Sequence, residues 1–273
     1  MPIIAITREM GSLGKDVARG LGDALGLPVI YHEVIDHLAD RLRVRKSHVI
    51  RLLDGSAGLL ERLTADKTSL AIYTADEIYG LAAKGGAIIR GWGATHLLRD
   101  IPHVVCVRVC APFELRKTRM MERLASDDEQ RVAEEIRAND EAHSAIMRRH
   151  FGVQWTEPEH YDVVLNTKRV PVDECVSEVL TLARAPQFEE TERSHAKLAD
   201  LALAARVRAA LRRAPETREA RVHVVSDTGR ITLSGATSTD EMLAFVELAS
   251  AVPGVRDVAY RTNPGEELRP RFH

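Results

Sequence analysis

A glycine-bearing turn directly after an apolar run most constrains how this chain can fold. Residues 3–7 (IIAIT) form a short β-branched run, and Gly11-Ser12-Leu13-Gly14 follows it closely. From Lys15 to Leu25 the apolar side chains recur at helical spacing. A turn of this kind between strand and helix gathers backbone N–H groups at the positive end of the helix, which suits a phosphate.

The turn matches the phosphate-loop motif G-x-x-x-x-G-K-[ST] only in part. Gly14 and Lys15 match, but Glu9 stands at the first glycine and Asp16 at the Ser/Thr position. A plain strand-to-helix turn would also use such glycines, whereas the place after the first strand favours phosphate. We therefore predict that phosphate groups are bound by Gly11, Ser12, Leu13, Gly14, Lys15 and Asp16.

Asp16 allows two interpretations. A carboxylate is a hard oxygen ligand and could hold Mg²⁺ in place of a hydroxyl group. The simpler interpretation, which we prefer, is an acid in the first turn of a helix, where the helix dipole favours negative charge.

Short apolar runs alternate with helical segments over the first 183 residues, which predicts an α/β fold with a doubly wound, mainly parallel sheet. The expected strands are residues 3–7, 29–31, 87–89, 104–109 and 161–166. The expected helical regions are residues 15–25, 33–83, 111–151 and 172–183.

The length of 273 residues predicts about two domains. An acid-rich stretch with little apolar content follows residue 183, and the pattern beyond it changes. We expect a helix at 198–211, two strands joined by a hairpin turn at 226–229, a second helix and a last strand. We predict an α/β domain at 1–185, a linker at 186–195, a small α+β domain (α-β-β-α-β) at 196–263, and a tail at 264–273.

Charge and composition exclude several classes of protein. The net charge is -2 and no segment is polybasic, so we expect no nucleic-acid partner. No stretch approaches the roughly 20 apolar residues of a membrane span. Cys106, Cys110 and Cys175 have neither metal-site nor disulfide spacing, which fits a reducing compartment. We therefore expect a cytoplasmic protein without a membrane span.

Four stretches, in order, resemble the cytidylate kinase-like family of P-loop nucleoside-monophosphate kinases. They are TREMGSLGK (7–15), AIIRGWGA (87–94), VCAPFELR (109–116) with Arg119, Glu122 and Arg123, and YDVVLNT (161–167). The resemblance implies a P-loop fold with a helical lid, and transfer of the γ-phosphate of ATP, with Mg²⁺, to CMP or dCMP.

Arginines suit such a reaction because a guanidinium group matches phosphate oxygens and keeps its charge. Arg116, Arg119 and Arg123 lie within an arc of about 60° on one helix face. They could close over the transferring phosphoryl group, although a solvated helix face is the alternative. We predict that Lys15 and these three arginines are the catalytic groups.

The acceptor side departs from the family pattern. The family turn G-R-G is Gly91-Trp92-Gly93 here, with Arg90 one residue earlier, and Trp92 could stack on a base or simply pack. The family places an arginine three residues after an aspartate, whereas His143 follows Asp140. Arg137 is the nearest substitute, and Glu33 could bind the acceptor or cap a helix. The predicted substrate-binding residues are Glu33, Arg90, Trp92, Arg137 and Asp140.

Residues 198–262 resemble a BON module. The runs D-x-G-x-I-x-L-x-G (227–235) and P-G-V-x-x-V (253–258) carry the resemblance. It implies a binding or regulatory role, by self-association or by binding a ligand, and we find no catalytic set of residues there.

Three functions remain open from the sequence. An active nucleoside-monophosphate kinase is favoured by Lys15 and the arginine face. A catalytically weak nucleotide-binding regulator that keeps the kinase fold is favoured by Trp92, His143 and Asp16. An assembly protein would fit a chain that had lost Lys15 and the arginines. The sequence leaves the acceptor base, the BON ligand and the oligomeric state open.

Overall fold

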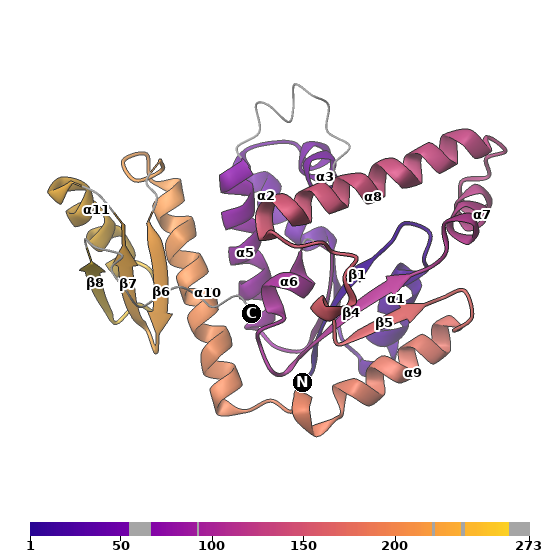
Figure 1. Cartoon of the computed structure of the whole chain (residues 1–273). Coiled ribbons are helices and arrows are strands. Elements are labelled where there is room, and N and C mark those ends of the chain that lie inside the picture. Colours follow the sequence, from indigo (N-terminus) through magenta and orange to yellow (C-terminus); the bar gives the residue numbers. More distant parts are fainter. Residues whose placement is uncertain (55–66, 92, 220–221, 236–237, 262–273) are drawn as a thin grey trace. The chain divides into compact units, whose positions relative to one another are not determined.

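The computed structural model describes residues 1–54, 67–91, 93–219, 222–235 and 238–261 (Figure 1). The chain divides into two compact units, Met1–Ser194 and His195–His273. Each unit is described by itself below.

The first unit is built on a five-stranded parallel sheet. Its strands are β1 (Ile3–Arg8), β2 (Val29–Ile30), β3 (Ala87–Arg90), β4 (Val104–Cys110) and β5 (Val163–Asn166). The order β2-β3-β1-β4-β5 places β1 in the centre, paired with β3 and β4. Residues 3–7 are buried, as expected for a parallel strand covered on both faces. The predicted doubly wound fold is confirmed.

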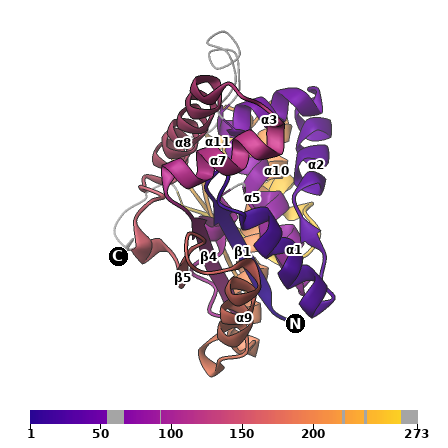
Figure 2. The same cartoon turned by 90° about the vertical axis from the view of Figure 1, so that its right-hand side faces the viewer.

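Helices lie on both sides of this sheet (Figures 1 and 2). On one side α1 (Gly14–Leu25) packs against α9 (Val172–Ala183), and Val17, Leu21 and Val179 belong to their shared core. The other helices are α2 (His32–Leu42), α3 (Lys46–Asp54), α5 (Lys67–Ala82), α6 (Ala94–Leu98), α7 (Phe113–Leu124) and α8 (Glu129–Phe151). Short 3₁₀ turns cover Pro158–His160 and Pro186–Phe188.

Two expected elements differ in detail. The helical region expected at 111–151 is interrupted, because Ala125 adopts the left-handed conformation (φ 48°) at the end of α7 and α8 starts anew with Asp128 as its N-cap. The strand expected from Tyr161 begins at Val163, since the Asp162 carboxylate accepts the N–H of Cys106 at 2.6 Å. Residues 55–66, expected to be helical, lie outside the described part.

Helices α7 and α8 pack against each other beyond the carboxyl end of β4, where a lid is expected (Figures 1 and 2). Helix α8 also contacts α3. These two helices therefore bring side chains from far along the sequence to the end of the sheet where the loop after β1 lies.

The second unit contains α10 (Glu192–Arg213) from His195 onward, followed by β6 (His223–Asp227), β7 (Arg230–Ser234), α11 (Thr239–Ser250) and β8 (Asp257–Arg261). Strands β6 and β7 form an antiparallel hairpin, and β7 pairs with β8 in parallel. Thr228 and Gly229 both have positive φ, as a two-residue hairpin turn requires. Fully buried Phe245 lies in the core. The predicted α-β-β-α-β order is confirmed.

Helix α10 starts at Glu192, six residues before the expected start, so it includes the end of the expected linker 186–195. No helix within the described ranges is long and apolar enough to cross a membrane.

Candidate functional site

The loop between β1 and α1 is fixed by its own side chains. Buried Ser12 donates its hydroxyl to the carbonyl oxygens of Glu9 (2.8 Å) and Val109 (3.0 Å). Gly11 has φ +79°, and a Cβ there would lie 2.7 Å from the carbonyl oxygen of Arg116. A Cβ on Gly14 would lie 2.5 Å from Cβ of Arg8. The loop thus depends on glycine at both positions.

The loop presents its amide groups at the start of α1. Leu13, with φ 63°, is the N-cap, and its carbonyl oxygen accepts the N–H groups of Asp16 and Val17. The N–H groups of Gly14 and Lys15 lie in the first turn, where α-helical hydrogen bonding leaves donors without partners. Together with the helix dipole, these donors suit an anion.

A cleft of about 680 Å³ opens in front of this loop, within the range of small-molecule sites. Two acids, Asp16 and Glu122, line it together with a larger group of cations. The cations are Arg8, Lys15, Arg19, Arg90, Arg119 and Arg123. This excess of positive charge fits a polyphosphate.

Glu9, which stands where the phosphate-loop motif has its first glycine, connects the loop to two other elements. Its Oε1 accepts from Nη2 of buried Arg108 on β4 at 2.6 Å. Its Oε2 accepts the N–H of Ala111 at 3.1 Å and lies 3.5 Å from Nε of Arg116. The acid therefore anchors the loop to β4 and α7, a role that the sequence pattern did not reveal.

Arg116 and Asp140, predicted as a catalytic and a substrate-binding residue, bind each other. The two Nη atoms of Arg116 reach the two carboxylate oxygens of Asp140 at 3.1 and 2.8 Å, and Nη1 also donates to the carbonyl of Met10. Arg116 is only 5% exposed. In this arrangement the pair joins α7, α8 and the loop, and Arg116 does not line the cleft.

The other two arginines of the predicted helix face, Arg119 and Arg123, do line the cleft. Arg119 is half-buried and donates to Oγ1 and the carbonyl oxygen of Thr167, both at 2.9 Å. Arg123 is exposed. The predicted helix face is therefore divided, with Arg119 and Arg123 towards the cleft and Arg116 beneath the loop.

A second, smaller pocket of about 90 Å³ adjoins the cleft. Arg8, Tyr31 and Arg90 line both cavities. The Arg90 guanidinium lies 3.8 Å from the centroid of the Tyr31 ring, and Arg90 is 7% exposed. The arginine before the Gly91 turn is thus directed to the junction of the two cavities.

His143 on α8 lines the smaller pocket. Its Nε2 lies 3.5 Å from Oγ1 of Thr7, and its ring meets the Trp155 ring edge-on at 4.2 Å. Burial, and secondarily the charges of Arg8 and Arg108, lower the pKa of His143 to about 4. The imidazole is therefore uncharged at neutral pH. The sequence marked His143 only as a departure from the family pattern.

The remaining predicted residues lie elsewhere. Glu33 is exposed and accepts the N–H of Tyr31 at 3.1 Å, as a helix-capping acid does. Arg137 is exposed, with its guanidinium 4.8 Å from the Phe113 ring centroid. Neither is among the described residues lining the two cavities. Trp92 lies outside the described residues.

Residues 3–169, more than half of the chain, match the cytidylate kinase-like family. The chain belongs to the cytidylate kinase-like family. Residues 199–262 match the BON domain. The second unit is thus a C-terminal BON domain.

Among solved structures, this kinase-like chain resembles an uncharacterized protein from Eubacterium ventriosum, with 21% identity, 68% of this chain and 99% of the other covered, and a TM-score of 0.52. It is also similar to an unliganded sugar kinase from Janibacter sp. (18% identity, 70% and 99% covered, TM-score 0.42). A shikimate kinase from Acinetobacter baumannii in complex with shikimate gives 14% identity, 67% and 92% coverage and a TM-score of 0.40. Comparison with curated proteins finds no match.

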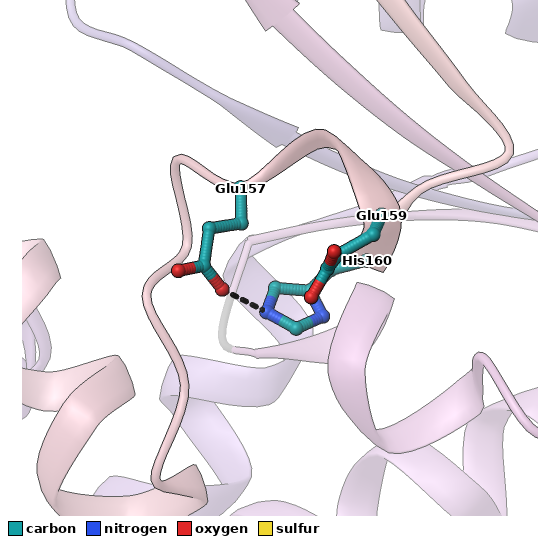
Figure 3. Close-up of side chains that lie close together, drawn as sticks. All are labelled: Glu157, Glu159 and His160. Atoms are coloured by element: carbon teal, nitrogen blue, oxygen red, sulfur yellow. Dashed lines mark hydrogen bonds and ion pairs between the residues drawn. The ribbon is translucent and has the colours of Figure 1, made fainter. Parts of the chain in front are cut away.

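A group of possible metal ligands lies between α8 and β5 of the kinase-like unit, and its residues are not among the described residues that line the cleft (Figure 3). One ligand atom from each of Glu157, Glu159 and His160 lies within 4.8 Å of the others. However, His160 Nε2 is 3.2 Å from Oε2 of Glu157, and its Nδ1 is 3.1 Å from Nη1 of Arg99. Both ring nitrogens of His160 therefore have partners, and one of these partners is the Arg99 cation. We interpret the group as a set of contacts that stabilises the loop, and not as a metal site.

Acid is expected to destabilise the kinase-like unit through two histidines. Burial lowers the pKa of His96, as of His143, from 6.5 to about 4. Between these values the unfolded chain binds more protons than the folded one, so stability falls as the pH falls through this window. The deeply buried His143 should cost about 2 kcal/mol at pH 5 relative to pH 7, and the half-buried His96 should cost less because solvent screens its charge.

Urea unfolding followed by tryptophan fluorescence measures this effect in the kinase-like unit, because both tryptophans, Trp92 and Trp155, belong to it. His143→Phe should lose part of the pH dependence between pH 7 and pH 5. An unchanged dependence in this variant would show that His143 does not contribute.

Proposed function

We propose that the kinase-like unit transfers the γ-phosphate of ATP to a nucleoside monophosphate, with CMP and dCMP as the first candidates. The observation that carries this proposal is the cation-lined cleft at the start of α1, which shares Arg8, Tyr31 and Arg90 with a second pocket. Two adjoining cavities with a common cationic border suit a donor and an acceptor whose phosphates must meet.

The roles follow from position. The loop N–H groups and Lys15 bind the β- and γ-phosphates of ATP, and Arg119 and Arg123 face the cleft from their positions on α7. Arg8 and Arg90 at the junction hold the acceptor phosphate. One of its oxygens attacks the γ-phosphorus, the bond to the β–γ bridging oxygen breaks, and ADP leaves. Such catalysis consists largely of positioning and charge stabilisation.

The family implies Mg²⁺, and Asp16 is the residue that would hold it. Asp16 lines the cleft in the first turn of α1, and its Oδ1 lies 2.9 Å from Nη2 of Arg19. A single carboxylate fits the ion's habit of binding one or two carboxylates together with substrate phosphates and water. Bound Mg²⁺ would supply charge neutralisation at the phosphates.

A coupled assay of ADP formation with CMP, dCMP, UMP and AMP tests the proposal. We expect turnover with at least one pyrimidine nucleotide. Absence of turnover with every acceptor, alongside measurable ATP binding, would reject the kinase. It would favour the second candidate, a nucleotide-binding regulator. The Arg116–Asp140 ion pair favours the regulator, because Arg116, one of the three arginines expected at the cleft, binds Asp140 and does not line the cleft.

For the BON domain we propose a binding or regulatory role, through self-association or a ligand. In support, residues 199–262 match the BON domain, a resemblance that implies such a role. Sedimentation of the full chain with and without ATP tests self-association.

A further inference from the structure

The smaller pocket has an uncharged interior and a cationic mouth. Apolar side chains form much of its wall: Leu70, Leu97, Ile146, Met147 and Phe151. Its polar side chains apart from the shared border are Thr7, Thr74, Asn139 and His143. The two guanidinium groups among its described lining residues, Arg8 and Arg90, are those shared with the phosphate cleft. A ligand that matches this pattern has an anionic end at the mouth and an uncharged group with apolar faces inside.

His143 is held firmly at this pocket from behind. The Trp155 ring lies against it, and Trp155 Nε1 donates to Oγ of Ser144 at 2.7 Å. The Ser144 hydroxyl in turn donates to the carbonyl of Asp140 at 2.7 Å. Because the ring that supports it is itself hydrogen-bonded, His143 has a fixed orientation, as a specificity-determining group requires.

The imidazole offers a ligand both a donor and an acceptor. Its Nε2 makes only the long 3.5 Å contact with Thr7, and within the described residues no hydrogen bond to Nδ1 is found. The charged groups that act on it are Arg8 and Arg108, which with burial keep it uncharged. An uncharged imidazole has one N–H donor and one acceptor nitrogen.

We propose that His143 determines acceptor specificity by hydrogen bonding to the uncharged polar edge of a nucleobase in the smaller pocket. This inference rests on the proposed function and adds the part of the substrate that His143 recognises. The apolar wall contacts the faces of the base, and Arg8 and Arg90 hold its phosphate at the mouth. An alternative acceptor would be a ring that carries a carboxylate. Inside the pocket that carboxylate would have no cation to pair with among the described lining residues, because Arg8 and Arg90 lie at the mouth.

Two substitutions separate hydrogen bonding from packing. His143→Phe keeps an aromatic ring against Trp155 but removes both nitrogens, and His143→Gln keeps a donor and an acceptor. For the nucleotide that the wild type phosphorylates best, we expect His143→Phe to raise the acceptor KM about tenfold, the value of one hydrogen bond. The KM for ATP should not change, and His143→Gln should restore most of the loss. His223→Phe, at an exposed site on β6, is the matched control and should behave as wild type.

Three results with the variants would each overturn the inference: an unchanged acceptor KM in His143→Phe, an equal rise in the KM for ATP, or equal defects in the Phe and Gln variants. Preference of the wild type for a carboxylate-bearing ring over every nucleotide would also overturn it. If the wild type binds CMP without turnover, the proposed kinase function fails, and the same comparison is made on the Kd for CMP by calorimetry. If it neither phosphorylates nor binds any nucleoside monophosphate, both fail.

Discussion

Replacing Lys15 with methionine should lower kcat/KM for phosphoryl transfer by at least about a hundredfold, the usual effect of removing one charge-stabilising donor. Lys15 is exposed in the first turn of α1 and lines the cleft. From there its ammonium group can follow the β- and γ-phosphates as charge develops. Methionine keeps much of the side-chain length and the helix propensity, so the change is confined to the charge.

The measurement is steady-state kinetics with the best acceptor, together with the Kd for ATP by calorimetry. Lys84→Met is the matched control, since Lys84 is exposed and is not one of the described residues lining either cavity. The control should behave as wild type. An unchanged ATP affinity and an unchanged kcat in Lys15→Met would mean that the turn after β1 is not the phosphate site.

Glu9→Gln is expected to destabilise the kinase-like unit by about 3 kcal/mol, because breaking a buried ion pair leaves a buried charge uncompensated. The Arg108 and Arg116 side chains that Glu9 contacts are each 6% exposed. Arg116 would keep Asp140 as a partner, but Arg108 would lose its ion pair with the loop. We also expect weaker ATP binding, since the N–H of Ala111 and the loop lose a common anchor.

Urea unfolding followed by tryptophan fluorescence measures the free energy of unfolding of this unit. Glu157→Gln is the control with the same chemistry. The Glu157 side chain is 42% exposed, so loss of its contact with His160 should cost less than about 1 kcal/mol. Equal losses in the two variants would contradict the anchoring role of Glu9.

Sequence reasoning worked where the signal is local. The apolar run 3–7, the glycines after it and the helical spacing from Lys15 predicted β1, its loop and α1. Strand runs alternating with helices predicted the parallel sheet, and the turn at Asp227–Gly229 predicted the hairpin of the BON domain. Each of these features depends on a few consecutive residues, whose backbone preferences do not require knowledge of distant contacts.

Sequence reasoning was less informative about the arginines of α7. Helical spacing placed Arg116, Arg119 and Arg123 on one face, but the partner of each guanidinium depends on what that face meets. Arg116 meets Asp140, 24 residues away on α8, while Arg119 meets Thr167 in the loop after β5. Only the packing of α7 against α8 and the loop divides the face.

By itself, the sequence determined the two-part architecture, the strand, glycine turn and helix at the start of the chain, and the family of each part. The tertiary structure decided which charges are available to a ligand. It paired Glu9 with Arg108, 99 residues away, and it placed His143 beside Thr7 in the pocket that adjoins the cation-lined cleft. The physical reason is that strand and helix patterns are short-range, whereas the partner of a buried charge is chosen by whichever distant element the fold brings within hydrogen-bonding distance.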